Sequence, residues 1–369
     1  MNTPAEKIRA EIAERGPISF VRFMELALYC PLCGYYEKKE DTPGQRGDFY
    51  TSVSVGPLFG ELLAFQFAEW MVECGVRSAE CGAADPLRLI EAGAHDGQLA
   101  RDILNWLRVR RPELFERIEY CIVEPSPTRQ LWQRETLTPF SDRVRWFETP
   151  RSALRTPYFT VVFSNELLDA FPVHRLGWDA KAKSWFEWGV TLDRERFVWV
   201  RLPPPAPSAI LHLPSSHELL AVLPDNFTTE ICPAAENWWR DAANSLPCGK
   251  LLTFDYGLSA EEFFSPQRTN GTLRAYRRHQ LADDLLAAPG EHDLTAHVNF
   301  TAIQRTGEAA GLKTGSFTSQ AQFLTGIAEK IWKPQSDFGE WSPEHTRQFQ
   351  TLTHPQHLGR AFRVLVQSR

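Results

Sequence analysis

The first 80 residues carry apolar positions at helical spacing. In residues 4–15 and 18–29, apolar side chains recur every three or four positions, and a Gly-Pro dipeptide separates the two runs. A third run of the same kind covers residues 57–74. This pattern predicts an N-terminal helical region over residues 1–80, with a polar, glycine-bearing loop at residues 40–50.

Farther along the chain, short apolar runs alternate with helical patterns. An amphipathic helix is predicted over residues 98–110, and another helix is predicted to open at Ser126-Pro127. Strands that alternate with helices indicate a mainly parallel sheet covered on both faces, which is a doubly wound α/β fold. The runs that predict buried strands cover residues 87–92, 119–124, 144–148, 158–165 and 249–257.

The alternation breaks between the fourth and fifth of these strands. Residues 173–202 read as an antiparallel β-meander, so we interpret residues 173–230 as a β-rich insertion in the chain. The α/β core is then expected over residues 81–172 and 231–369. In its last part we expect helices near 299–310, 319–331 and 342–352 and a final strand at 361–368.

The turn after the first predicted strand reads Glu91-Ala-Gly93-Ala-His95-Asp-Gly97. A tight strand-to-helix turn needs residues that tolerate a positive φ and that leave room for a ligand against the backbone. The helix that follows directs free N–H groups toward such a ligand. The turn therefore predicts a nucleotide or S-adenosylmethionine (SAM) site, although an ordinary glycine turn has the same local pattern.

Glu124 ends the second predicted strand. In nucleotide-binding α/β folds, a carboxylate at this position accepts hydrogen bonds from the ribose hydroxyls. The alternative is a surface glutamate without a ligand.

Nine further segments of the chain are informative through their content and their order. They are GPISFVRFMELALYCPLCGYY (16–36), GDFYTS (47–52), FGELLAFQFAEW (59–70), LIEAGAHDGQLARDIL (89–104), VEPSP (123–127), FSNELLDAFPVH (163–174), FDYG (254–257), GTLRAYRRH (271–279) and DLTAHVNF (293–300). In this order they resemble the MidA family, from about residue 16 to residue 330. A eukaryotic relative in that family is a mitochondrial complex I assembly protein-arginine methyltransferase.

This resemblance implies a class I methyltransferase fold, SAM as cofactor and a protein substrate with arginine as the methyl acceptor. It makes a respiratory complex I subunit the candidate partner. The chain departs from the family at His95, where the family usually has glycine; histidine tolerates left-handed geometry better than most residues. The resemblance implies cofactor binding by Gly47, Asp48, Glu91, Gly93, Gly97, Glu124 and Asn165, with Gly47 and Asp48 on a lid loop of the N-terminal region that covers the cofactor. His95, in the same turn as Gly93, is a further candidate for a cofactor contact.

Four residues are candidates for the chemistry of methyl transfer: Glu166, Asp169, Asp255 and His297. If their segment is helical, Glu166 and Asp169 share one face and form a bidentate clamp for a guanidinium. The alternative is that Asn165 caps the next helix, with Glu166 in its first turn. Asp255 either lines the ligand crevice at the carboxyl ends of the strands or forms a hydrogen bond within a turn. His297 is a candidate general base or a structural hydrogen-bonding group.

Composition and cysteine spacing bear on three further questions: nucleic-acid binding, location in the cell and metal binding. The 40 Lys and Arg against 46 Asp and Glu leave a net charge of −6 and no basic stripe, so we do not expect nucleic-acid binding. The sequence has no apolar run of membrane-spanning length and no secretory signal, which predicts a bacterial cytoplasmic protein without membrane insertion. Cys30 and Cys33 have metal-ligand spacing, but a structural zinc site needs four ligands, so no metal is predicted.

Three other functions compete with a protein methyltransferase. A nicotinamide-dependent oxidoreductase would favour a complete G-x-G-x-x-G turn, which this chain lacks. A non-catalytic SAM-binding assembly factor would retain the fold without turnover. A small-molecule methyltransferase would have a closed pocket for the methyl acceptor, whereas a protein methyltransferase would have an open one. The insertion 173–230 is expected near this acceptor site in either case.

Overall fold

The computed structural model describes residues 3–38, 51–77, 87–154, 158–205, 213, 217–277, 280–334 and 336–369. The chain forms two compact units, each built from three segments. The first unit comprises Met1–Phe49, Leu168–Asn237 and Gly257–Ile303. The second comprises Tyr50–Leu167, Trp238–Tyr256 and Gln304–Arg369. The predicted insertion at residues 173–230 lies within the first unit. The boundaries predicted for the N-terminal region and for the α/β core remain predictions.

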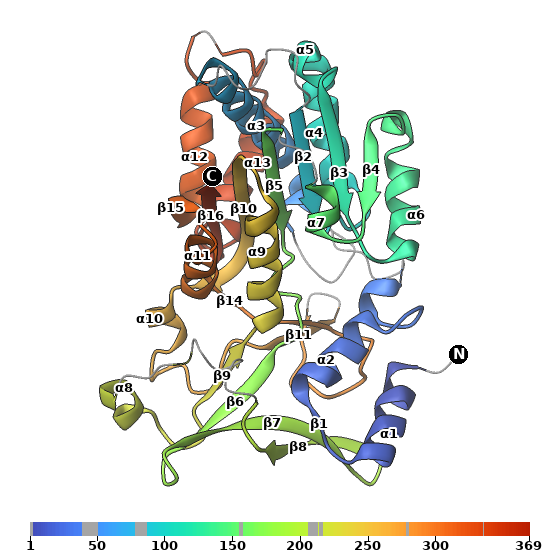
Figure 1. The fold of residues 1–369 in the computed structure, drawn as a ribbon, viewed down its shortest axis with the longest axis vertical. Helices are drawn as coiled ribbons and strands as arrows, with labels where there is room; N and C mark the ends of the chain where they lie inside the picture. Colours follow the sequence, from blue (N-terminus) through green and yellow to red (C-terminus); the bar gives the residue numbers. More distant parts are fainter. Residues whose placement is uncertain are drawn as a thin grey trace. The chain divides into compact units, whose positions relative to one another are not determined.

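The main sheet has the strand order β15-β16-β10-β5-β2-β3-β4 (Figure 1). The five strands from β10 to β4 are parallel, and β15 and β16 are antiparallel to their neighbours. The predicted α/β class is therefore confirmed. The strands are β2 (Leu87–Ala92), β3 (Ile118–Val123), β4 (Val144–Phe147), β5 (Thr160–Asn165), β10 (Gly249–Leu258), β15 (Lys313–Ser319) and β16 (Phe362–Ser368).

Helices cover this sheet because its central strands are apolar on both faces. Every residue of β2 is buried, as expected for a strand between two layers. Helix α3 (Leu58–Arg77) packs on α4 (Gln98–Arg110), and both contribute to the core cluster with Leu89 and Phe163. The other helices of this unit are α5 (Pro112–Phe115), α6 (Pro127–Thr136), α7 (Pro150–Ala153), α12 (Gln320–Ile331), α13 (Pro343–Thr353) and α14 (Leu358–Ala361), with 3-10 turns η2 (Val53–Val55) and η3 (Thr138–Phe140).

Strand β15 was not predicted from the sequence. Its residues are mostly polar and half-buried, and its pairing with β16 is irregular between Thr314 and Ser316. An edge strand of this kind lacks the apolar alternation by which strands are recognised. The strand exists because the regular, apolar β16 offers it a partner.

The first unit contains an antiparallel sheet with the order β1-β7-β6-β9, and β8 pairs with β7. The meander expected at residues 173–202 is present as β6 (His174–Asp179), β7 (Ser184–Asp193) and β8 (Arg196–Leu202). The short strands β1 (Ile18–Ser19) and β9 (Thr228–Ile231) complete it. A second sheet, which the sequence did not predict, consists of β12 (Gln280–Leu281), β11 (Arg274–Arg277) and β13 (Asp293–Thr295).

The helices of the first unit include α1 (Pro4–Arg15) and α2 (Phe20–Tyr29), close to their predicted bounds. Its other elements are η1 (Tyr35–Glu37), α8 (His217–Val222), α10 (Ala260–Phe263) and β14 (Val298–Asn299), which pairs with the end of β10. Helices α9 (Pro233–Ser245) and α11 (Phe300–Ala309) cross from the first unit into the second.

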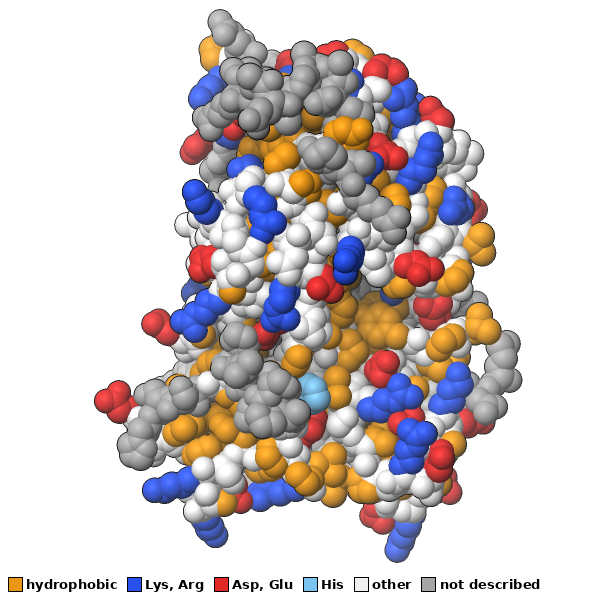
Figure 2. All heavy atoms as spheres, viewed as in Figure 1, with side chains coloured by type: hydrophobic (Ala, Val, Ile, Leu, Met, Phe, Trp, Pro, Cys, Tyr) orange, Lys and Arg blue, Asp and Glu red, His pale blue; other side chains and the backbone are white. Residues whose placement is uncertain are grey.

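Two surface features bear on possible partners. Among the described helices, none combines the length and the apolar character that a bilayer crossing requires. Figure 2 shows basic and acidic side chains interspersed over the face drawn, whereas a nucleic-acid interface gathers basic residues on one face.

Candidate cofactor and active site

The turn between β2 and α4 has the left-handed backbone that its sequence requires. The φ angles are 73° at Gly93, 46° at His95 and 88° at Gly97, which is the N-cap of α4. A Cβ atom on Gly93 would lie 2.9 Å from Leu167 Cδ1, so only glycine fits without displacing that side chain. The turn thus presents bare backbone at the carboxyl end of β2, where open α/β sheets bind ligands.

His95 occupies its left-handed position with two local contacts. Its main-chain carbonyl accepts a hydrogen bond from Gln133 Nε2 at 3.0 Å, and its ring Nδ1 lies 3.6 Å from Asp96 Oδ1. Burial alone would raise the pKa of Asp96, but His95 and the Gln98 N–H outweigh burial and hold that pKa below its usual value. The histidine is therefore accommodated in the turn.

Glu124 is only 2% exposed, so the interpretation as a surface glutamate is wrong. The Ser126 N–H donates to Glu124 Oε1 at 2.9 Å. Its other oxygen, Oε2, receives longer contacts from Gln133 Nε2 at 3.3 Å and from Arg129 Nη1 at 3.5 Å. One oxygen thus has a short hydrogen bond, and the other has two longer contacts, of which the one with Arg129 is an ion pair.

Gln133, on α6, is a residue that sequence analysis missed. It is fully buried, and its amide joins the turn and the acid, because Nε2 donates to the His95 carbonyl and to Glu124. Its Oε1 accepts a hydrogen bond from Trp146 Nε1 at 2.9 Å. No local signal separates this glutamine from the half-exposed Gln130 on the same helix, because their roles differ only through tertiary contacts.

Glu91 lies beneath the turn and is 2% exposed. The Tyr120 hydroxyl donates to Glu91 Oε2 at 2.6 Å. Burial raises the pKa of Glu91 to about 8, so the carboxyl group is largely protonated at neutral pH. The carboxyl group is therefore part of the buried support of the turn, and a direct contact with a cofactor stays a prediction.

Asn165 and Glu166 lie at the carboxyl end of β5. Asn165 Nδ2 donates to Glu166 Oε1 at 2.9 Å, while Asn165 Oδ1 is buried without a hydrogen-bond partner among the described residues. Glu166 has a φ of 53°, and its N–H donates to the Phe254 carbonyl at 2.9 Å. A left-handed glutamate costs roughly 1–2 kcal/mol, and such strain is concentrated at functional sites.

The segment after β5 is not helical, which corrects two expectations. Residues 166–173 form bends and turns, so Asn165 does not cap a helix and Glu166 is not in a first helical turn. The helical spacing invoked for Glu166 and Asp169 is absent too. Asp169 belongs to the first unit, where it is buried and its carbonyl accepts from the Ala296 N–H at 3.0 Å.

Asp255 and Glu166 follow paired residues on adjacent parallel strands, because Phe254 on β10 is in register with Asn165 on β5. The Asp255 side chain is fully buried and accepts from the Tyr256 N–H at 2.9 Å. Glu166 and Asp255 therefore occupy adjacent positions on neighbouring strands, at the end of β5 and within β10.

His297, in the first unit, has its pKa lowered to about 4, chiefly by burial and further by Arg268 and Arg274. Its ring is thus neutral at physiological pH and only weakly basic. Its main-chain N–H donates to Thr272 Oγ1 at 3.1 Å. The ring lines a cavity of about 30 Å³, together with Glu230 and Cys232; this space holds about two water molecules.

Two predicted residues, Gly47 and Asp48, lie outside the described residues. Among the residues that the structure does describe, no group of three or more His, Cys, Asp or Glu side chains could hold a metal ion.

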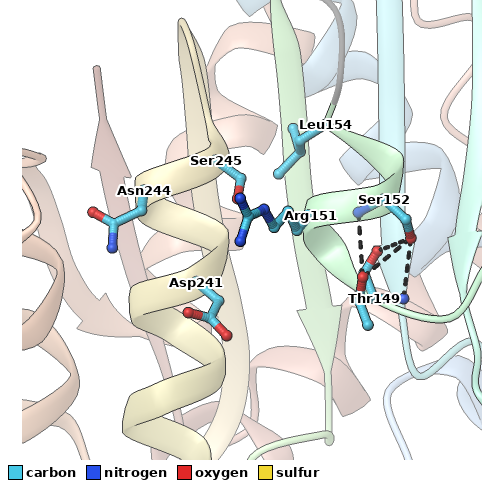
Figure 3. Close-up of a pocket in the computed structure, with 7 residues that line it drawn as sticks. All are labelled: Thr149, Arg151, Ser152, Leu154, Asp241, Asn244 and Ser245. Atoms are coloured by element: carbon cyan, nitrogen blue, oxygen red, sulfur yellow. Dashed lines mark hydrogen bonds between the residues drawn. The ribbon is translucent and has the colours of Figure 1, made fainter.

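A larger groove, of about 730 Å³, lies between α7 and α9 in the second unit (Figure 3). It contains none of the predicted site residues. Leu154 follows α7 and Ser245 ends α9, the helices that precede β5 and β10, so the groove is near the amino ends of these strands. Ligands in open α/β sheets bind at the carboxyl ends, and we therefore do not assign the cofactor to this groove.

Comparisons with known proteins point to one family. Residues 62–318 match the model of a family of S-adenosyl-L-methionine-dependent methyltransferases. The chain is 29% identical to the Drosophila melanogaster mitochondrial protein arginine methyltransferase NDUFAF7 homolog, over 83% of this chain and 70% of the relative. It is 24% identical to human NDUFAF7, over 98% and 84%. A Burkholderia thailandensis protein crystallised with S-adenosyl-homocysteine superimposes with a TM-score of 0.83 at 32% identity, covering 99% of this chain and 92% of that one.

Proposed function

Because the chain belongs to the MidA family of SAM-dependent methyltransferases, we propose that it methylates a guanidinium nitrogen of an arginine in a protein substrate. The names of relatives at 24–29% identity support arginine as the acceptor. We further propose a respiratory complex I subunit as the substrate, as the family resemblance implies.

The residues described at the end of β2 and β3 fit SAM. Gly93 keeps the turn free of a side chain beside Leu167, and the buried Glu124 offers a carboxylate oxygen whose contacts with Gln133 and Arg129 are long. Asn165 Oδ1 supplies a buried acceptor that has no partner among the described residues. We assign the backbone of Gly93 and Gly97 and the side chains of Glu124 and Asn165 to cofactor binding. When bound, SAM supplies an electrophilic methyl group for an in-line displacement.

The observation that carries the proposal is the contact between the segment after β5 and the glycine turn. Leu167 lies against Gly93 at the point where a side chain would otherwise stand. The residue before Leu167 is the strained Glu166. An acidic residue therefore adjoins the proposed cofactor turn, as alignment of an acceptor with the methyl donor requires.

A guanidinium is fully protonated in water, with a pKa above about 12, so it needs carboxylates that orient it and favour loss of a proton during transfer. We propose that Glu166 provides the main contact with the guanidinium and that Asp255 adds negative charge from the neighbouring strand. Asp169 remains a proposed second contact with the guanidinium, although the segment between Glu166 and Asp169 is not helical. His297 remains a proposed proton acceptor, although its low pKa makes it a weak one.

The non-catalytic alternative draws on two departures of the sequence, His95 in the glycine turn and the unusual start of the chain. The contacts of His95 with Gln133 and Asp96 accommodate the residue in the turn, and this favours a working cofactor site.

The test is a methylation assay with isotope-labelled SAM and purified bacterial complex I subunits. We expect labelled methylarginine, located by peptide mass spectrometry, and an equal amount of S-adenosylhomocysteine. Glu166→Gln is expected to retain S-adenosylhomocysteine affinity in calorimetry and to lose most of the transfer. Label on another type of residue would overturn the arginine assignment, and cofactor binding without any turnover would favour the non-catalytic assembly factor.

A further inference from the structure

The segment Cys30-Pro-Leu-Cys33 takes no part in the methyltransferase site proposed above. Cys30 is the C-cap of α2, and the N–H groups of Cys33 and Gly34 both donate to its carbonyl, at 3.1 and 2.7 Å. A Cβ on Gly34 would lie 2.5 Å from the Leu28 carbonyl oxygen, so glycine is required for the chain to turn back so closely. The two cysteines are held together by the backbone.

The two sulfur atoms are in direct contact. Cys33 Sγ lies 3.0 Å from Cys30 Sγ, and Lys7 Nζ, from α1, lies 2.8 Å from the same Cys30 sulfur. Both hydrogen bonds therefore have Cys30 Sγ as the acceptor. The hydrogen bond to Cys30 raises the pKa of Lys7, which keeps the ammonium charged beside the sulfur.

This geometry does not suit zinc. Two thiolates of a tetrahedral zinc site lie about 3.8 Å apart, as Zn–S bonds of about 2.3 Å require. The observed separation of 3.0 Å is shorter, and the described residues contain no third ligand that would complete a site.

We propose that Cys30 and Cys33 form a site of reversible disulfide formation, whose co-substrate is a low-molecular-weight disulfide. A C-x-x-C pair fixed at a helix end, with a lysine beside one sulfur, has the arrangement that thiol–disulfide exchange requires.

The exposure of the two cysteines decides which sulfur attacks the small disulfide first. Cys33 is partly exposed, whereas Cys30 is 2% exposed. The Cys33 sulfur, after losing its proton to solvent, attacks one sulfur of the small disulfide and releases one small thiol. The Cys30 sulfur then attacks the Cys33 sulfur of this mixed disulfide and displaces the second small thiol, which takes up the remaining proton. The Cys30 and Cys33 thiols lose two electrons and two protons in total, and the small disulfide gains them.

Burial and hydrogen bonding raise the pKa of Cys33, so the first step is expected to accelerate with rising pH. Lys7 stabilises negative charge on Cys30 and therefore promotes the second step. The other cysteines offer internal controls. Cys121 is buried, and burial raises its pKa to about 12, so it should not react.

The test uses the full chain and oxidised glutathione. After incubation, the remaining thiols are alkylated, and intact and peptide masses are measured. We expect the peptide with Cys30 and Cys33 to lose two hydrogens and to regain them with dithiothreitol. Alkylation of both cysteines after incubation of the folded chain would overturn the proposal.

Variants separate the two steps. Cys30→Ser, or Cys30→Ala if the serine variant unfolds, should retain glutathione on Cys33 as a stable mixed disulfide. Cys33→Ser should leave Cys30 unmodified, and Lys7→Met should slow loss of the mixed disulfide severalfold. Cys74→Ser is the matched control and should behave as the native chain. Equal, persistent adducts on both cysteines of the native chain would contradict the mechanism.

Discussion

Gln133 Nε2 donates a hydrogen bond to the main-chain carbonyl of His95 at 3.0 Å and so joins helix α6 to the glycine turn after β2. The same amide nitrogen contacts Glu124 Oε2 at 3.3 Å. The two sequence elements that indicated a cofactor, a turn and a strand-end acid, are thus connected by a third residue. One buried amide therefore bridges the ends of the paired strands β2 and β3.

Replacing Gln133 with leucine should loosen this connection. The His95 carbonyl and Trp146 Nε1 would each lose a partner, at a cost of roughly 1–3 kcal/mol in unfolding free energy. We expect S-adenosylhomocysteine affinity in calorimetry to fall severalfold as well. Gln350→Leu, at an exposed helical position on α13, leaves these contacts in place and should have the smaller effect. Equal effects of the two substitutions would contradict this role for Gln133.

Gly93→Ala should abolish or strongly weaken cofactor binding, because a Cβ would be placed at a φ of 73° and 2.9 Å from Leu167 Cδ1. We expect at least about a tenfold loss of affinity, which corresponds to about 1.4 kcal/mol. Gly326→Ala is the matched control, since nothing lies within 4 Å of its added Cβ. Unchanged affinity in Gly93→Ala would refute the assignment of the cofactor to this turn.

Glu124→Ala should weaken SAM binding at least severalfold, since charge-assisted hydrogen bonds contribute roughly 1.5–3 kcal/mol each. Calorimetry with SAM measures the change. The exposed Glu113 provides the control, and its alanine variant should bind as the native chain does. A native dissociation constant in Glu124→Ala would mean that the ribose is held elsewhere.

Glu91 should make stability depend on pH. Its pKa is about 8 in the folded chain against an ordinary value of 4.5, so the folded state holds a proton that the unfolded state releases between these values. Its contribution to stability is therefore fully present below pH 4.5 and is lost as the pH rises toward 8, by at most about 1.4 kcal/mol per pH unit. Glu91→Gln should remove this slope in denaturant titrations between pH 5 and 8. The exposed Glu113→Gln should retain it, and a slope unaffected by Glu91→Gln would show that the carboxyl group is not protonated.

Glu166→Gly should raise stability and lower activity together. Glycine relieves the left-handed strain, which is worth roughly 1–2 kcal/mol, but it removes the proposed guanidinium contact. Lys183→Gly is the control, because Lys183 has a similar φ of 51° in an exposed turn between β6 and β7. Both variants should melt at higher temperature, and only Glu166→Gly should lose methyl transfer. Native activity in Glu166→Gly would remove this residue from the chemistry.

The sequence by itself determined the features that local rules govern. The apolar run at residues 87–92 and the amphipathic pattern at 98–110 predicted β2 and α4, because burial on two faces or on one stripe imposes these periodicities. The glycine turn was predictable as well, since a left-handed backbone strongly favours glycine at positions 93 and 97.

Only the tertiary structure decided what depends on distant neighbours. Burial raises the pKa of Glu91 although the hydrogen bond from Tyr120 opposes the rise, and burial near arginines lowers the pKa of His297. No spacing in the sequence reveals either shift. The strain at Glu166 arises where β5 meets β10, and the polar β15 forms only because β16 is beside it. Solvation, strand pairing and side-chain hydrogen bonds are set by residues far apart in the chain, and for this reason the sequence predicted the main elements of the α/β core but not the state of the groups in its site.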